Sequence, residues 1–221
     1  MSEVRQRWRL VVRRGEAACE LSQRAVETLW EEGLVRAGVP VALTTTGRPR
    51  PRIAFAAPVP VGLTAEREPL DVFLVDRLTI ADLRTLLHRA LPPGHELVDL
   101  HDVWIGEPSI AGQVIAADYR VEVAGDPPAL GAAVAAILSS GRIDRQRRKG
   151  EEGRTYDLRP LIVGLEVRPI DAGSALLRMR LRHDPELGSG RPDEVLAALG
   201  ERLGGEITVR AIVRERLVLR G

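Results

Sequence analysis

The stretch from Thr79 to Ile105, TIADLRTLLHRALPPGHELVDLHDVWI, is the clearest guide to the fold. Thr79 is a favoured helix N-cap, and the residues behind it predict a helix that runs to Ala90. Three apolar side chains repeat at helical spacing and form one stripe, namely Ile80, Leu83 and Leu87. The Pro-Pro-Gly run at 92–94 ends this helix, and residues 96–105 are predicted to form a strand.

The first half of the chain shows the order strand, helix, strand, strand, helix, strand. Its other predicted segments are a strand at 5–13, a helix at 19–37 and extended stretches at 41–45, 52–57 and 70–75. The second half repeats this order, with strands or extended stretches at 113–123, 156–167, 174–181 and 206–219, and helices at 127–138 and 191–203. Two successive β-α-β-β-α-β units are typical of a duplicated ferredoxin-like fold.

We therefore predict an α+β protein made of two tandem ferredoxin-like halves, residues 1–106 and 107–221. Each half is expected to have an antiparallel sheet with helices packed on one face. At 221 residues the chain is long enough for two small domains.

Composition favours a soluble cytoplasmic protein. No apolar run approaches the roughly 20 residues that cross a bilayer, and residues 1–10 lack the apolar centre of a signal peptide, so no membrane partner is expected. Cys19 is the only cysteine, which fits a reducing compartment. Lys149 is the only lysine among 32 basic residues, and the net charge is only +1. Any anion-binding site must therefore be local.

The least ordinary local feature is the run Gly47-Arg48-Pro49-Arg50-Pro51-Arg52. Prolines keep the backbone extended, so Arg48, Arg50 and Arg52 are displayed at a spacing of two on a stiff segment, roughly on one side. This arrangement could bind phosphates or a carboxylate. The alternative is a solvated surface loop.

A second basic stretch lies at a similar place in the second half. Its candidate anion or RNA ligands are Arg145, Arg147, Arg148 and Lys149. If the halves are related by duplication, the two basic loops could form one bipartite anion site. The alternative is a flexible charged loop, because Gly150 and Gly153 flank its acidic end.

Strand arginines offer a third basic surface. Arg178, Arg180 and Arg182 share one face of a predicted strand, and Arg210, Arg214 and Arg216 share a parity on the last strand. Aromatic residues make up only 3% of the chain, which argues against a base-stacking platform of the RNA-recognition type. Phosphate contacts remain compatible with such a surface.

Catalytic and metal-binding patterns are weak. Asp71, near Glu68 at a predicted strand start, and Asp157, two residues before Arg159, are the only catalytic candidates, and both could equally belong to structural ion pairs. The four histidines and Cys19 have no metal-ligand spacing and are expected at the surface or at helix ends, so we expect neither a metal nor a cofactor.

Several runs resemble a bacterial family, the radical-SAM-linked domain of unknown function (DUF2344), over nearly the whole chain. They are residues 48–55, 58–62, 68–72, 157–162 and 191–196. The chain departs from the family after Ser22, where relatives have Ser-His-Leu-Asp, and at Thr44-Thr45-Thr46-Gly47, where relatives have a Ser-Glu-Gly-Phe-Asn type of run. The resemblance implies a radical SAM protein as partner and carries over no catalytic residue.

Residues and resemblance together lead us to expect a non-catalytic accessory protein that presents RNA or another anionic substrate to a radical SAM enzyme. Two alternatives stay open at this point. One is an RNA-processing or RNA-modifying enzyme with a carboxylate-containing cleft between the halves. The other is a protein-binding scaffold that uses exposed sheet edges.

Overall fold

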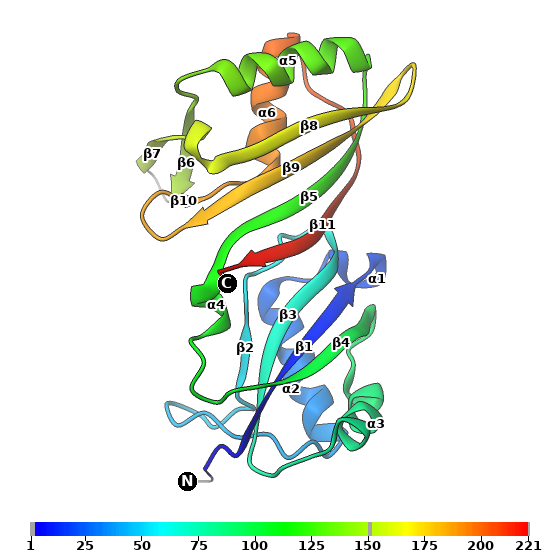
Figure 1. The fold of residues 1–221 in the computed structure, drawn as a ribbon, viewed down its shortest axis with the longest axis vertical. Helices are drawn as coiled ribbons and strands as arrows, with labels where there is room; N and C mark the ends of the chain where they lie inside the picture. The colour runs from blue at the N-terminus through cyan, green and yellow to red at the C-terminus, as the bar shows by residue number, and fades with distance from the viewer. Residues whose placement is uncertain (1–2, 150–151, 221) are drawn as a thin grey trace. The chain divides into compact units, whose positions relative to one another are not determined.

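The computed structural model describes residues 3–149 and 152–220. The chain forms two compact units, of which unit 1 comprises residues 1–114 and 219–221, and unit 2 comprises residues 115–218. Both contain helices and antiparallel strands, so the predicted α+β class is confirmed (Figure 1). Within the described ranges, no helix has the length and apolar character needed to span a membrane.

Unit 1 is a four-stranded antiparallel sheet with helices between the strands. Its strands lie in the order β4, β1, β3, β2, and each neighbouring pair is antiparallel. In chain order its elements are β1 (Gln6–Arg14), α1 (Glu16–Cys19), α2 (Gln23–Arg36), β2 (Ile53–Phe55), β3 (Thr64–Leu74), α3 (Ile80–Ala90), β4 (His95–Val103) and α4 (Ile110–Gln113).

Apolar and polar residues alternate along the strands, so one face of this sheet is apolar and packs against the helices to form the core. Trp8, Leu10 and Val12 of β1 are buried together with the apolar residues of α2 and α3, among them Trp30, Leu34, Leu83 and Leu87. The Thr79 hydroxyl accepts the Asp82 N–H at 3.2 Å, as expected of an N-cap. The predicted helix over 19–37 is divided instead, because the Ser22 hydroxyl caps a new helix by accepting the Ala25 N–H at 3.3 Å.

The opposite face of the unit 1 sheet is covered by the segment that follows β4. In this segment Ile110 of α4 is fully buried, and α4 contacts β2 and β3. Residues 107–113 therefore pack onto unit 1, although the sequence prediction assigned them to the second half.

Unit 2 contains its own antiparallel strands and helices. Strand β9 pairs with β5 along one edge and with β8 and β10 along the other, and β11 neighbours β5. Its elements are β5 (Val114–Ala124), α5 (Pro127–Ser139), β6 (Asp144–Lys149), β7 (Glu152–Asp157), a 3-10 turn (Arg159–Leu161), β8 (Ile162–Asp171), β9 (Ser174–Asp184), β10 (Gly188–Ser189), α6 (Pro192–Leu203) and β11 (Val209–Leu219). The stretch predicted as a basic loop contains the β6–β7 hairpin.

Period-two patterning also sorts the two faces of the unit 2 sheet. Tyr119, Val121 and Val123 of β5 and Leu177, Met179 and Leu181 of β9 are buried, as are Ile137 of α5 and Leu199 of α6. The intervening residues of both strands are polar and lie on the opposite face. The unit 2 sheet therefore has one apolar, buried face and one charged face.

Candidate functional site

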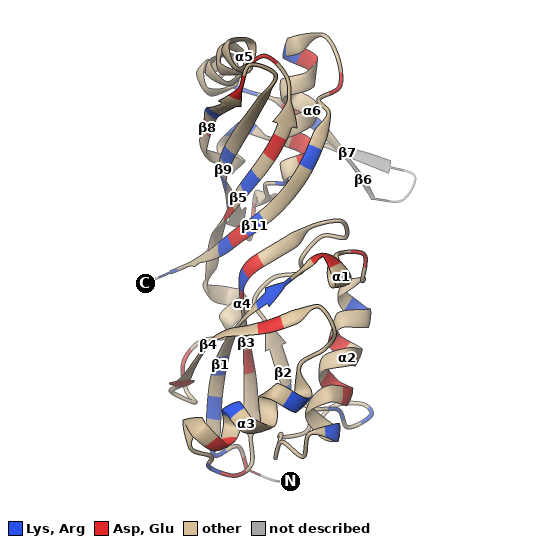
Figure 2. Ribbon diagram, turned by 90° about the vertical axis from the view of Figure 1, so that its right-hand side faces the viewer, with Lys and Arg blue, Asp and Glu red and all other residues tan. Residues whose placement is uncertain are grey.

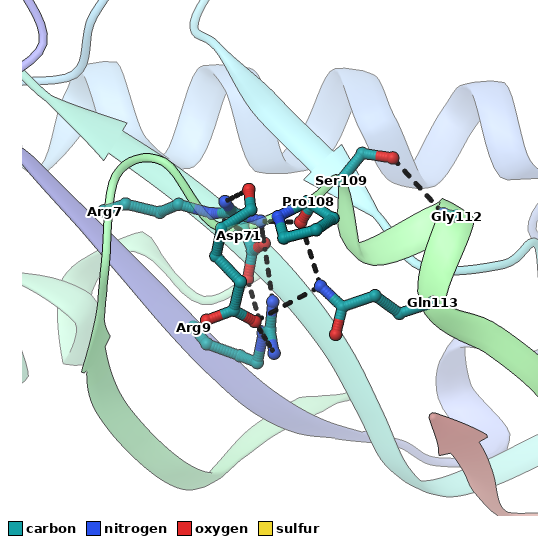
Figure 3. A network of polar contacts seen from close by, with 8 residues as sticks. Arg7, Arg9, Asp71, Pro108, Ser109, Gly112 and Gln113 are labelled. Carbon is teal, nitrogen blue, oxygen red and sulfur yellow. Dashed lines mark hydrogen bonds and ion pairs between the residues drawn. The ribbon is translucent and has the colours of Figure 1, made fainter. Parts of the chain in front are cut away.

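Asp71 lies at the centre of a buried ionic network in unit 1 (Figure 3). The prediction placed it near the start of a strand, but β3 begins at Thr64, so Asp71 is in the strand interior and fully buried. Two guanidinium groups from β1 enclose its carboxylate. Arg7 donates to Oδ2 from Nε at 3.0 Å and from Nη2 at 2.5 Å, while Arg9 donates to Oδ1 at 2.8 Å and to Oδ2 at 3.1 Å.

The same two arginines hold the segment that covers this face of the sheet. Arg7 donates to the carbonyl oxygens of Glu107 at 2.5 Å and Pro108 at 3.0 Å, and Arg9 pairs with the Glu107 carboxylate at 3.2 Å. The Gln113 amide donates to Glu107 Oε1 at 3.2 Å and to the Pro108 carbonyl at 2.9 Å. The network therefore fastens residues 107–113 to the sheet, and Asp71 is fully occupied by that structural role.

Asp157, the other catalytic candidate, is a local anchor in unit 2. Its Oδ1 accepts the backbone N–H of Ile143 at 2.8 Å and of Arg159 at 3.0 Å, at the base of the β6–β7 hairpin. The Arg159 side chain donates instead to the carbonyl of Leu138, at 2.9 Å and 3.2 Å, and so closes the C-terminal end of α5. Asp157 and Arg159 thus each bind backbone groups.

The proline-arginine run forms a well-held loop beside β2. Its backbone is fixed by hydrogen bonds from Thr44 N–H to the Arg50 carbonyl at 2.9 Å and from Arg52 N–H to the Ala42 carbonyl at 2.7 Å. The side chains have different partners. Arg50 lies 3.4 Å from Glu31 of α2, whereas the Arg52 guanidinium lies 4.1 Å from the centre of the Phe73 ring. Arg48 is exposed.

Of the four candidate ligands in the second basic stretch, only Arg145 has a described side chain, and it is largely enclosed. It pairs with Glu201 of α6 at 2.6 Å and lies 3.9 Å from Glu194, with 11% of its side chain exposed. Arg145 therefore fastens the hairpin to α6. The backbones of Arg147, Arg148 and Lys149 belong to β6, and their side chains lie outside the described part of the structure.

The open face of the unit 2 sheet gathers arginines from several strands (Figure 2). We call this set the arginine face. It comprises Arg120 of β5, Arg168 of β8, Arg178, Arg180 and Arg182 of β9, and Arg210 and Arg216 of β11, interleaved with Asp118, Glu122, Glu166 and Glu215. The three arginines of β9 lie on one face of the strand, as predicted. They pair with Ala116, Asp118 and Arg120, which occupy alternate positions of β5.

The four acids on this face do not neutralise its seven arginines. Among the described residues, Glu122 pairs with Arg210 alone and Glu166 with Arg168 alone, while the other two acids are shared. Asp118 accepts from Arg180 at 2.7 Å and from Arg216 at 2.8 Å, and the Arg180 contact is the main reason that the pKa of this carboxyl is lowered. Glu215 lies 3.5 Å from Arg120 and 3.7 Å from Arg178. Each of these two carboxylates serves two guanidinium groups, which leaves excess positive charge facing solvent.

The last strand departs from the sequence expectation at one position. Arg210 and Arg216 are exposed, but Arg214, which has the same parity, is only 2% exposed. Arg214 is therefore excluded from the arginine face. The exposed Arg182 makes no ion pair with another described residue.

One histidine is also placed differently from the expectation. His95 is 8% exposed, and its ring meets Trp30 edge-on at a centroid distance of 6.0 Å. Burial lowers the pKa of this imidazole. Among the described residues, no group of three or more His, Cys, Asp or Glu side chains could hold a metal ion.

Comparison with known proteins assigns the chain to a family. Residues 7–190 match the model of DUF2344, described as an uncharacterized protein conserved in bacteria. The chain belongs to the DUF2344 family. No curated protein matches it at a significant level.

One solved structure shares the fold of this DUF2344 protein, and two others match it with lower scores. A crystal structure of a Cbf5-Nop10-Gar1 complex matches 94% of the chain at 10% identity and a TM-score of 0.52, and the chain spans 48% of that protein. An archaeal box H/ACA sRNP Nop10-Cbf5 complex matches at 11% identity with a TM-score of 0.48. This match covers 94% of the present chain and 47% of the other. An unknown protein from Galdieria sulphuraria matches at 14% identity with a TM-score of 0.27. This match covers 97% of the present chain and 99% of the other.

Proposed function

We propose that this DUF2344 protein is a non-catalytic accessory module that binds an anionic substrate, with RNA as the first candidate, and presents it to a radical SAM enzyme. The binding part of the proposal is carried by the arginine face of unit 2. The partner part is supported by the sequence resemblance to radical-SAM-linked proteins.

The arginine face has the chemistry that phosphate recognition needs. Guanidinium groups offer planar, bidentate donors, and here they stand on neighbouring strands of one sheet, which fixes their spacing. They remain accessible, since the side chains of Arg178, Arg180 and Arg216 are 44%, 43% and 58% exposed. Because the net charge of the chain is only +1, attraction for a polyanion must arise from such a local excess.

The proline-arginine loop is a second phosphate contact in this proposal. Arg48 is exposed, and Arg52 is held over Phe73, which leaves the outer side of its guanidinium to a ligand. Arg50 contributes less, because Glu31 lies 3.4 Å away. We also propose that both units are ferredoxin-like halves, since the order β4, β1, β3, β2 of unit 1 recurs in unit 2 as β11, β5, β9, β8.

The geometry does not favour the enzyme alternative. Asp71 is enclosed by two arginines and Asp157 by two backbone N–H groups, so each carboxylate is committed to a structural contact. The proposed role is therefore binding rather than proton transfer.

The first experiment replaces Arg178 and Arg182 together with alanine and measures the affinity for a single-stranded RNA as a function of salt. Each phosphate contact that is lost should lower the slope of log K against log salt by about 0.7. We expect a drop of about 1.4 in slope and weaker binding at low salt.

A matched variant replaces Arg84 and Arg89 with alanine. These arginines are exposed on α3 of unit 1, so the net charge changes equally while the arginine face is kept. We expect this variant to retain the parent slope. An Arg178→Ala/Arg182→Ala variant with unchanged affinity and slope would remove the arginine face from the proposal.

A further inference from the structure

Unit 1 displays an exposed tryptophan that the proposed function does not use. The side chains of Trp8 and Trp30 are buried, but Trp104, directly after β4, is 77% exposed. Exposing an indole forgoes a large apolar contact, so a large exposed aromatic surface commonly marks a contact with a ligand or partner. The strand prediction over residues 96–105 gave no sign of this exposure.

A tight turn holds the indole in place. The Glu107 N–H donates to the Trp104 carbonyl at 3.0 Å and closes the turn. The ring lies against Gly106, where an added Cβ would come within 2.6 Å of ring atom Cζ2. One side of the indole is thus supported by glycine, and the ring is pre-positioned before any ligand arrives.

Beside the indole is a hollow of about 290 Å³ with cationic groups at its rim. It is lined by Trp104, Val103 and Ile105, by Arg5 and Gln6 at the start of β1, by Arg77 before α3, and by Asp102 at the end of β4. Arg5 and Arg77 are exposed and form no ion pair with any other residue that the structure describes.

Gln6 joins the three segments that form the hollow. Its side-chain oxygen accepts the Leu78 N–H at 2.9 Å, and its amide nitrogen donates to the Leu78 carbonyl at 3.3 Å and to Asp102 Oδ2 at 3.0 Å. These hydrogen bonds of Gln6 connect the segments that carry Trp104, Arg5 and Arg77, and they therefore fix the spacing between the three side chains.

We propose that this hollow binds one nucleotide, whose base stacks on Trp104 and whose phosphate is held by Arg5 and Arg77. A volume of about 290 Å³ is at the lower end of ligand pockets, which suits a single nucleotide. Aromatic stacking accepts any base, and two unpaired guanidinium groups match a phosphate. The carboxylate of Asp102 supplies an acceptor for a ligand N–H or O–H. This proposal does not depend on the arginine face of unit 2.

The test titrates the full chain with AMP, adenosine and the single-stranded trinucleotide of adenosine, by isothermal titration calorimetry and by intrinsic fluorescence. Emission should be quenched by AMP, because Trp104 is the exposed indole. Trp104→Ala should weaken AMP binding by about 5- to 150-fold, as expected for loss of one base stack. Trp104→Phe should retain part of the affinity.

The phosphate contact is tested separately with Arg5→Ala/Arg77→Ala. This variant should weaken AMP binding and leave adenosine binding unchanged. Arg84→Ala/Arg89→Ala on α3 removes the same charge, serves as the charge control and should bind AMP like the parent. AMP binding equal to that of the trinucleotide would identify a free nucleotide as ligand, and tighter trinucleotide binding would identify a strand. Both rankings support the site. Absence of quenching by either ligand, or parental affinity in Trp104→Ala, would overturn it.

Discussion

At the residue scale, the buried carboxylate of Asp71 shows how unit 1 tolerates charge inside its fold. Burying an isolated carboxylate is very unfavourable, and here four guanidinium N–H groups surround it. Glu107 supplies the second negative charge that Arg7 and Arg9 require, because its carboxylate pairs with Arg9. The group is close to neutral as a whole, so it can be enclosed.

Replacing Asp71 by asparagine should destabilise unit 1 strongly. The substitution preserves the shape of the side chain but leaves two buried guanidinium groups with one carboxylate between them. We expect the free energy of unfolding in urea to fall by about 3–5 kcal/mol. Asp76→Asn, an exposed change in the same unit, should stay within about 0.5 kcal/mol of the parent. A loss below about 1 kcal/mol for Asp71→Asn would contradict the structural role.

Residue types alone gave only part of this network. Along β1, Trp8, Leu10 and Val12 stand at alternate positions, which predicts one apolar face. The alternation does not show that Arg7 and Arg9 on the other face are buried. Their burial depends on residues 107–113, which cover that face of the sheet. No local sequence pattern predicts that this segment packs there. Two arginines at alternate positions in a strand, with one acid on a neighbouring strand, are the signal that could have been used.

At the element scale, the approach of α2 to α3 depends on a glycine. An added Cβ on Gly33 would lie 2.0 Å from the carbonyl oxygen of Ala90, at the end of α3. The two helices can therefore be this close only because position 33 has no side chain. Leu83 and Leu87 of α3 pack in one core with Trp30 and Leu34 of α2, whereas Ile80, predicted to belong to the same stripe, is exposed.

Gly33→Ala is expected to destabilise the protein despite the better helix propensity of alanine. Separating the two backbones disturbs a packed core, at a cost of about 1–3 kcal/mol. Gly131→Ala in α5 is the matched change, since a Cβ there meets nothing within 4 Å. It should stabilise the protein by about 0.5–1 kcal/mol, as helix propensity predicts. Thermal unfolding of both variants checks the opposite signs, and equal effects would exclude the close-approach explanation.

At the scale of the whole molecule, the distribution of charge matters more than its total. The chain is almost neutral, yet the arginine face of unit 2 keeps a local excess because Asp118 and Glu215 are each shared by two arginines. The Trp104 hollow belongs to unit 1, and the arginine face belongs to unit 2. Each site is built from residues of one compact unit.

The two proposed sites should therefore respond independently to substitution. Arg178→Ala/Arg182→Ala is expected to leave the AMP affinity of the Trp104 hollow within about twofold, since substitutions at sites that share no residue usually add. Trp104→Ala should leave the salt slope of RNA binding unchanged, because stacking releases no counterions. Calorimetry with AMP and salt titrations with RNA measure both effects. A coupling of more than about tenfold between the sites would contradict their independence.

The amino-acid residues alone predict the α+β class, the order of most helices and strands, and the alternation that separates buried from polar faces. They also carry the resemblance to the DUF2344 family. These features are local, because periodicity and capping depend on residues a few positions apart. The burial of the charged residues Asp71, Arg7 and Arg214, and the exposure of Trp104, follow from the folded arrangement and not from local patterns. Burial and pairing depend on segments far apart in the chain that meet across a sheet, and a sequence pattern read along one segment contains no information about its partner.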